Sequence, residues 1–509
     1  MTAAEVVELT PEAPAHLTKQ SAAAWHFAKT AGDRVRYDHG RSRWLIWAGH
    51  RWQPDEDGTI RRLWLDVLAD RYRLALRADD RQHALAEVQT AGATDGAVTG
   101  GLQLASNFRP IATRAGAWDP NAWLVGCENG VVDLRTGELR DGRPEDMISR
   151  STLVNFDPAA ECPRWTRFLT EVFAGDEELI TWFARLAGSM LIGLSFELLA
   201  VWHGLGNNGK SVAIKSCRRA FGDYAVTIPI ETLINAKRSA GAATPDLMVL
   251  RGARVAFAAE PSKAAKLAGG TLKRLASVDQ ISGRTLYADQ AAWNPTHSLV
   301  LATNHLPTAD DVTDSFWRRI ALVPWTTRFG KPGENGVRPE DPNLSETLAG
   351  EAAGILAWAV RGAVALAGGA SLWPFPASVQ AKTAAYRANE DRLGAFAESH
   401  VVYEKDADVT LNALFAAYER WCNEEDVPLD ERFRSRAFST EFEERGRVQR
   451  YRDGHNWPHF RGARLASESE LTNSRPDSRN PPASGEIWKE CEMPSELVSS
   501  DDETPEETT

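Results

Sequence analysis

The stretch Leu198-Leu-Ala-Val-Trp-His-Gly-Leu-Gly-Asn-Asn-Gly-Lys-Ser211 decides the fold class. Its apolar start is typical of a buried strand, its centre matches the pattern Gly-x-x-x-x-Gly-Lys-Ser, and residues 212–221 have the pattern of a helix. A strand, a glycine-rich loop and a helix in this order are the context that a phosphate-binding loop requires. We therefore expect an α/β fold with a P-loop NTPase core.

Each part of this loop has an expected role. The glycines let backbone N–H groups curl around phosphates, and the start of the helix adds a partial positive charge. Lys210 is expected to reach the β and γ phosphates of ATP, and the hydroxyl of Ser211 to ligate Mg²⁺. The alternative is a glycine-rich turn that matches by chance. The predicted cofactor-binding residues are Gly204, Gly206, Asn207, Asn208, Gly209, Lys210 and Ser211.

Two further apolar runs end in polar residues. Residues 254–260 end in Glu260, a carboxylate where one is needed to polarise an attacking water near Mg²⁺. Residues 298–304 end in Asn304, whose amide can orient the same water or sense the γ-phosphate. Taken singly, Glu260 is about as well explained as a solvent-facing residue at a strand end, and Asn304 as a turn residue.

Paired arginines follow in Phe316-Trp-Arg-Arg-Ile320. An arginine that faces the nucleotide of a neighbouring subunit can stabilise the charge of phosphoryl transfer. Alone, Arg318 and Arg319 would be an ordinary salt-bridging pair.

These four features occur in order within residues 204–319, and this order resembles the superfamily 3 helicases. The resemblance is to the helicase half of phage and plasmid primase/helicase proteins related to the poxvirus primase/helicase. It extends to residues 129–139, to Cys162-Pro-Arg-Trp165, to residues 354–362 and to the C-terminal module, or roughly residues 20–465.

The resemblance implies an AAA+ ATPase that forms a hexameric ring around DNA, with the nucleotide between subunits. It implies Walker A roles for Lys210 and Ser211, a Walker B role for Glu260 with Ser211 as its partner at the metal, and a polar-sensor role for Asn304. Arg318 or Arg319 is the implied arginine finger, supplied in trans. The implied catalytic set is Lys210, Glu260, Asn304, Arg318 and Arg319.

The segment from Leu272 to Tyr287 matches the extra motif of this family that is associated with DNA contact in the central channel. Lys273 and Arg284 are accordingly the DNA-binding candidates. The alternative is that these two cations pair with Asp279 and Asp289.

The chain also departs from the family pattern. Ala258 and Ala259 precede Glu260, so there is no adjacent second carboxylate, and Ser277-Val-Asp279 replaces the Gly-Gly-Asp turn of the family. The primase domain that often precedes this helicase has no room before residue 20, so we do not expect primer synthesis and expect a separate primase or other replication proteins as partners.

Six segments are expected along the chain. They are an α+β N-terminal domain (1–160), a helical collar (161–195), the AAA+ core (196–335), a helical extension (336–390), a winged-helix-like DNA-binding module (391–465) and a disordered acidic tail (466–509). The basic part of the module, residues 432–465, carries 9 basic and 4 acidic side chains with Tyr451, Trp457 and Phe460 among them. A solvated arginine face would explain this composition equally well.

Charge and cysteine content leave DNA open as a partner. The net charge of the 509 residues is −12, but the tail contributes −9 of it, which leaves −3 for residues 1–465. The five cysteines are spread singly, without a Cys-x-x-Cys pair, and suggest neither a zinc site nor a disulfide framework. We expect no membrane segment and a cytoplasmic setting, that of the host cell for a phage protein.

The function expected from the sequence is that of an ATP-dependent DNA helicase in phage, prophage or plasmid replication, acting as a ring on single-stranded or forked DNA. One alternative is an initiator that uses ATP as a switch to bind or melt an origin without processive unwinding. The other is a P-loop kinase of a small molecule, which would leave the paired arginines and the DNA-binding module without a role.

Overall fold

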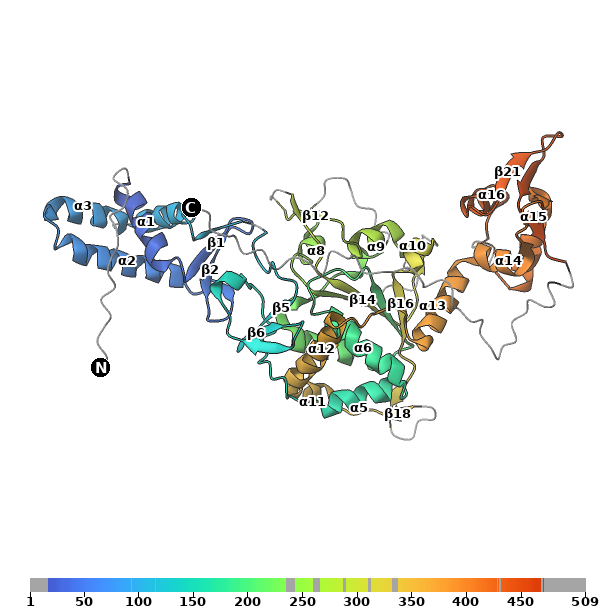
Figure 1. Ribbon diagram of the computed structural model, residues 1–509, viewed down its shortest axis with the longest axis horizontal. Coiled ribbons are helices and arrows are strands. Elements are labelled where there is room, and N and C mark those ends of the chain that lie inside the picture. The colour runs from blue at the N-terminus through green and yellow to red at the C-terminus, as the bar shows by residue number, and fades with distance from the viewer. Residues whose placement is uncertain are drawn as a thin grey trace, which may run out of the picture.

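The computed structural model describes most residues between 17 and 470 (Figure 1). The described ranges are 17–92, 94–114, 116–234, 243–259, 266–286, 290–309, 313–331, 337–427, 429, 432–467 and 470. Glu260 and almost all of the predicted acidic tail lie outside these ranges.

Two small sheets with separate packing form the N-terminal part of the chain. In the first, four helices pack beside a sheet of order β3-β2-β1-β4, with Phe27 and Trp64 fully buried between them. The second is the antiparallel sheet β5-β6-β7, whose buried side chains join the hydrophobic cluster of the core. The elements are α1 Lys19–Ala31, β1 Val35–Asp38, β2 Arg43–Trp47, β3 Trp52–Pro54, α2 Thr59–Ala75, α3 Arg81–Gly92, α4 Asp95–Ala105, β4 Ala112–Thr113, β5 Leu124–Cys127, β6 Gly130–Asp133 and β7 Glu138–Arg140.

The centre of the molecule is a five-stranded sheet of order β16-β8-β14-β10-β9, in which every neighbouring pair is parallel. Its strands are β8 Leu199–His203, β9 Ala225–Thr227, β10 Val255–Ala259, β14 Ser298–Thr303 and β16 Ile320–Pro324. Nearly all of their residues are buried, as expected for a parallel sheet covered on both faces. This sheet confirms the α/β class predicted from the sequence.

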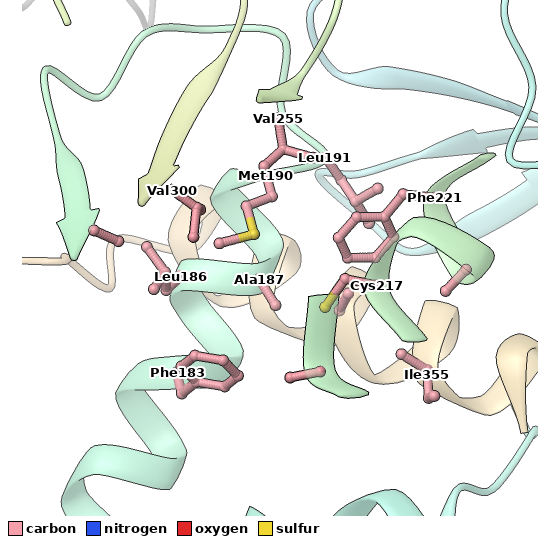
Figure 2. Packing of buried hydrophobic residues seen from close by; sticks show 14 of the residues in the cluster. Phe183, Leu186, Ala187, Met190, Leu191, Cys217, Phe221, Val255, Val300 and Ile355 are labelled. Atoms are coloured by element: carbon pink, nitrogen blue, oxygen red, sulfur yellow. The ribbon is translucent and has the colours of Figure 1, made fainter. Parts of the chain in front are cut away.

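Alternate residues of each strand face two different hydrophobic clusters. Along β8, Ala200 and Trp202 join the cluster that contains α5 Pro163–Val172, α6 Glu177–Ser189, α7 Lys210–Phe221 and α12 Ala352–Ala367, whereas Leu199 and Val201 face the opposite cluster. Figure 2 shows α6 and α7 meeting the sheet through Leu186, Met190, Cys217 and Val300. The segments predicted as collar, core and extension thus share one core.

The remaining elements of the core include α11 Leu344–Gly350, which packs with α5, α7 and α12, and others that cover the opposite face and the edges of the sheet. These others are α8 Pro245–Met248, β11 Lys266–Leu267, α9 Gly269–Leu275, β12 Ile281–Gly283, β13 Ala291–Trp293, β15 Thr308–Ala309, α10 Asp314–Trp317, β17 Phe329–Gly330, β18 Arg338–Pro339 and α13 Ala377–Glu390.

The C-terminal residues form a compact unit with its own hydrophobic cluster. Three helices alternate with short strands, and β20, β22 and β21 make an antiparallel sheet in that order. The elements are α14 Arg392–His400, β19 Val401–Val402, β20 Asp408–Thr410, α15 Leu411–Glu424, α16 Ser435–Glu444, β21 Gln449–Arg452, β22 Pro458–Arg461 and β23 Arg464–Leu465.

Within the described ranges no single helix is long and apolar enough to cross a membrane. The bent pair of α11 and α12 reaches that composition only when the two helices are taken together, and α12 is largely buried in the core. Burial raises the pKa of Cys127 and of Cys217 to about 12, so both thiols stay protonated near neutral pH.

Arg254 joins the N-terminal part to the central sheet. It precedes β10, is 2% exposed, and its guanidinium donates to the carbonyl oxygens of Ala122 (3.0 Å), Leu124 (2.7 Å) and Leu191. It also lies 4.8 Å from the centre of the Tyr224 ring. A buried guanidinium is tolerable only when carbonyl oxygens accept its hydrogen bonds, so this residue fixes β5 against the start of β10.

We predict that Arg254→Met destabilises the protein by about 3 kcal/mol, because several buried carbonyls lose a charged donor at once. The free energy of unfolding, from urea titration, measures the effect. Arg219→Met, an exposed arginine on α7, is the matched control. Equal stability of the two variants would contradict the anchoring role of Arg254.

Candidate functional site

The ammonium group of Lys210 lies at the centre of the candidate site. Its Nζ donates to the carbonyl oxygen of Gly204 (2.7 Å), to Oδ1 of Asn208 (2.9 Å) and to Oδ1 of Asn304 (3.0 Å). The residue is 6% exposed. Loop, helix and strand thus meet at one cation, and Asn304, predicted separately from the loop, lies beside Lys210.

The loop needs its glycines for two different reasons. A side chain at Gly204 would collide with Asn208 and with the carbonyl oxygen of Trp325, which would lie 2.2 Å from the added carbon. Gly209 has φ +88°, a backbone conformation that residues with a side chain rarely adopt. A side chain at this position would also collide with the ring of Phe168. The amide of Asn208 donates to Trp325 O (3.2 Å). The loop is therefore held in shape by the strand end and by α5.

The register of the sheet explains why Asn304 reaches Lys210. Strands β8 and β14 are parallel, with His203 opposite Thr303, so Gly204 and Asn304 both follow the carboxyl ends of adjacent strands. Strand β10, which leads to Glu260, pairs with β14 and ends at the same edge, with Ala259 opposite Ala302. Glu260 itself lies outside the described residues.

The start of α7 is open to an anion. Gly209 occupies its N-cap and offers no side chain, and the first N–H groups of a helix have no acceptor within the helix. Ser211 is the second residue of α7 and is exposed. No group of three or more His, Cys, Asp or Glu residues able to hold a metal ion occurs among the described residues.

Positive charge dominates this edge of the sheet. The pKa of His203, which ends β8, is lowered first by burial and next by the charges of Lys210 and Lys382. Lys210 and Lys382 thus place positive charge near the carboxyl end of β8.

The paired arginines occupy different environments. Arg319 is 8% exposed and donates to Ala276 O (3.0 Å), Ser315 O (2.6 Å) and the carboxylate of Glu197 (2.7 Å). The Arg318 side chain is 53% exposed, and its guanidinium is 3.8 Å from Glu197. Arg319 is therefore committed to contacts within its own chain, whereas Arg318 is presented at the surface.

Both arginines lie far from the glycine-rich loop of the same chain. They precede β16, whose first residue pairs with Leu199 at the start of β8, so they lie at the amino edge of the sheet. The loop follows the carboxyl end of β8, four residues or about 13 Å further along the strand. The structure does not bring Arg318 and Arg319 together with Lys210.

The two DNA-binding candidates, Lys273 and Arg284, also lie apart from Lys210. Lys273, on α9, donates to Thr313 Oγ1 (3.1 Å), and α9 ends beside Arg319. Arg284 directly follows β12 and is exposed, with its backbone N–H on Thr244 Oγ1 (3.1 Å). Of their suggested acidic partners, Asp279 accepts from Ser277 (3.1 Å), and Asp289 lies outside the described residues.

Two residues that hold parts of the candidate site in place, Glu197 and Arg254, were not predicted from the sequence. Glu197 holds Arg319, and Arg254 anchors the strand that leads to Glu260. A signal existed for Glu197, since it is the single charge that interrupts the apolar stretch 186–202. No sequence signal marked Arg254, because its acceptors are backbone carbonyls distant in the chain.

Comparisons with known proteins bear on this architecture. Residues 24–174 match the family model described as D5 N terminal like. A protein of Acanthamoeba polyphaga mimivirus, provisionally named helicase L207/L206, is 30% identical over 220 residues, which is 42% of this chain and 23% of that protein. The chain is a relative of viral helicase and primase proteins. This confirms the resemblance predicted from the sequence.

Two further viral relatives of this group cover more of the chain. Frog virus 3 has a protein provisionally named helicase 022R, 25% identical over 377 residues, which is 60% of this chain and 39% of that protein. African swine fever virus has a protein provisionally named primase C962R, 24% identical over 324 residues, which is 60% of this chain and 34% of that protein. The chain therefore spans about a quarter to two fifths of these viral relatives.

A solved structure, the apo structure of the NrS-1 C-terminal region, covers 86% of this chain and 99% of its own, with a TM-score of 0.45 and 10% identity.

We predict that Lys210→Ala abolishes nucleotide binding, because it removes the cation at the centre of the loop. Lys215→Ala, an exposed lysine on the same helix, is the control and should bind as the unaltered protein does. Equilibrium titration with a fluorescent ATP analogue in the presence of Mg²⁺ measures both. Equal affinity of the two variants would show that the loop does not hold phosphate.

Proposed function

We propose that this chain is an ATP-dependent DNA helicase of the superfamily 3 AAA+ type that acts in viral, prophage or plasmid DNA replication. The observation that carries the proposal is the position of Lys210, held by Asn304 and Asn208 at the carboxyl edge of a parallel sheet. The similarity to viral proteins named as helicases supports a role of this site in DNA replication.

The loop fits the triphosphate of a nucleotide. Lys210 would neutralise its β and γ phosphates, and the uncapped start of α7 would donate backbone N–H groups to them. Ser211 and Glu260 would hold Mg²⁺, which supplies charge neutralisation between the phosphates. Asn304 would position water beside the γ-phosphate, a role open to its side-chain amide because that amide reaches the same point as Lys210.

A second subunit is needed to complete this site. Because Arg318 lies at the amino edge of the sheet and the loop at the carboxyl edge, Arg318 can meet a nucleotide only in a neighbouring copy. Its exposure leaves it available for that contact, and we propose it as the arginine finger of a ring, with six copies as the family pattern implies. Arg319 would support it from within the chain.

The C-terminal unit supports a DNA-binding role. Its helices and the sheet β20-β22-β21 are consistent with the predicted winged-helix-like module, in which β21 and β22 would form the wing. Trp457 lies between these strands and is 56% exposed, and Arg450 and Arg452 are on β21. Phe460, another aromatic residue of this basic stretch, is fully buried in the core of the unit. It is therefore not available to contact DNA.

We predict that Arg318→Ala lowers ATP turnover about a thousandfold while leaving thermal stability unchanged. Arg319→Ala should instead lower the melting temperature, because it strips two backbone carbonyls and Glu197 of a buried donor. Mixing Arg318→Ala with Lys210→Ala subunits should restore hydrolysis, since each supplies what the other lacks. An inactive mixture, or an active Arg318→Ala protein, would contradict the role in trans.

A strand-displacement assay tests the proposal against its alternatives. The purified chain with ATP should displace a long annealed strand from a forked substrate, and Lys210→Ala should not. An initiator would bind one DNA sequence and fail to displace the strand. A small-molecule kinase would transfer phosphate to an acceptor and ignore DNA, and either result would overturn the proposal.

A further inference from the structure

A cavity of about 1080 Å³ lies between the first N-terminal sheet and the core. Residues of β2, β3 and the turns around them form one wall, and residues 149–153 continue it. Asp223, Val226, Met248, Val249, Arg251 and Thr285 of the core form the other wall. Five arginines face this cavity, namely Arg41, Arg43, Arg51, Arg150 and Arg251.

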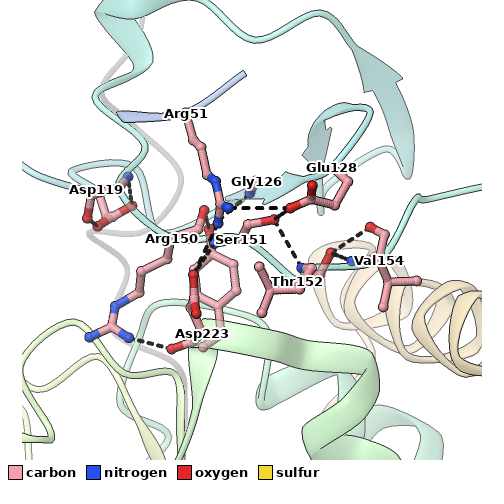
Figure 3. Close-up of polar contacts among 12 residues, drawn as sticks. Arg51, Asp119, Gly126, Glu128, Arg150, Ser151, Thr152, Val154 and Asp223 are labelled. Carbon is pink, nitrogen blue, oxygen red and sulfur yellow. Dashed lines mark hydrogen bonds and ion pairs between the residues drawn. The ribbon is translucent and has the colours of Figure 1, made fainter. Parts of the chain in front are cut away.

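Two of these arginines bind the two parts of the chain to each other. Arg51 lies 3.2 Å from the carboxylate of Asp223 and 3.5 Å from Glu128, and Arg150 donates to the carbonyl oxygen of Asp223 (Figure 3). Arg150 also donates to the carbonyl oxygen of Arg251 (2.9 Å). Glu128 in turn accepts from Ser151 (3.1 Å). The floor of the cavity is therefore a fixed polar network.

Arg43 has no comparable partner. It is half-buried, its Nε is fully shielded from solvent, and no acceptor among the described residues takes a hydrogen bond from its guanidinium. Its pKa is lowered first by burial and then by the charge of Arg41, and Arg150 acts in the same direction, while Asp38 opposes them. A half-buried guanidinium without a hydrogen-bond acceptor favours binding of an anion.

The acidic residues around the cavity pair with some of its arginines but not with all of them. Asp223 is paired with Arg51, and Asp57 accepts from Arg62 and Thr59. Glu56 is exposed at the rim. Arg41 is paired with the buried Asp38 (3.6 Å), whereas Arg43 and Arg150 form no ion pair with a carboxylate among the described residues.

Size and position favour a nucleic-acid strand over a small anion. The cavity exceeds the usual 300–1,000 Å³ of small-ligand pockets, and exposed residues such as Leu153 and Val249 leave it open to solvent. Thr285, which lines it, directly follows Arg284, one of the two predicted DNA contacts. The arginine cavity and the β12–β13 hairpin are thus neighbours on one surface.

We propose that the arginine cavity binds the phosphate backbone of single-stranded DNA on its way to or from the core, with the guanidinium of Arg43 as one of its phosphate contacts. The proposal rests on the proposed helicase function. The N-terminal part of the chain would then guide the strand that the core moves, and the two parts would grip one DNA molecule together.

Binding of a labelled oligothymidylate, followed by fluorescence anisotropy at several salt concentrations, tests this proposal. Arg43→Gln should weaken binding roughly fivefold to tenfold and reduce the slope of log affinity against log salt by about 0.7, the value for one lost phosphate contact on a single strand. Arg43→Lys should keep most of the affinity and most of the salt dependence. The control is Arg61→Gln on α2, an exposed arginine paired with Asp95 outside the cavity, which should change neither.

The outcomes separate this inference from the proposed function. If the oligonucleotide binds the unaltered chain and Arg284→Gln weakens it, but Arg43→Gln behaves as Arg61→Gln does, the cavity proposal alone is wrong. If the unaltered chain binds no DNA, both proposals are wrong. If Arg43→Gln weakens a fluorescent ADP analogue instead of DNA, the cavity holds a free nucleotide and the proposal is likewise overturned. Equal melting temperatures of the variants show that the fold is retained.

Discussion

The buried ammonium of Lys210 is the contact on which the candidate site depends. An ammonium group out of water is stable only if oxygen atoms accept its hydrogen bonds, and here they come from Gly204, Asn208 and Asn304. These three acceptors tie the loop to itself and to the end of β14. A phosphate bound to Lys210 would compete with these oxygen atoms for the hydrogen bonds of its ammonium group. Nucleotide binding and the position of Asn304 are therefore coupled.

The parallel sheet then separates two kinds of chemistry. Every strand ends at the edge that carries the loop, and every strand begins at the edge that carries Arg318 and Arg319. A single chain cannot bring these edges together, which makes assembly a requirement of the proposed reaction. Arg254 fixes β5 to this sheet by buried hydrogen bonds, and Arg51 and Arg150 join the two walls of the arginine cavity. A strand of DNA held in the cavity would therefore act on a fixed neighbour of the core.

The sequence predicts the local features well and the distant contacts poorly. The loop at 204–211 and the strand that ends before Asn304 follow from apolar runs and glycine spacing, which are local properties. The burial of Arg319 and the exposure of Arg318 could not be predicted, because Glu197, the carboxylate that binds Arg319, lies more than a hundred residues away in the sequence. The arginine cavity is hidden for the same reason, since its walls come from segments that only the fold brings together.

A DNA helicase couples ATP hydrolysis to DNA, so hydrolysis at the Lys210 site should depend on DNA. The rate of ATP hydrolysis by the purified chain, measured with and without single-stranded DNA at two salt concentrations, tests it most directly. The account predicts strong stimulation by DNA that falls as salt rises, because phosphate contacts weaken with ionic strength. Hydrolysis that is indifferent to DNA at both salt concentrations would contradict it.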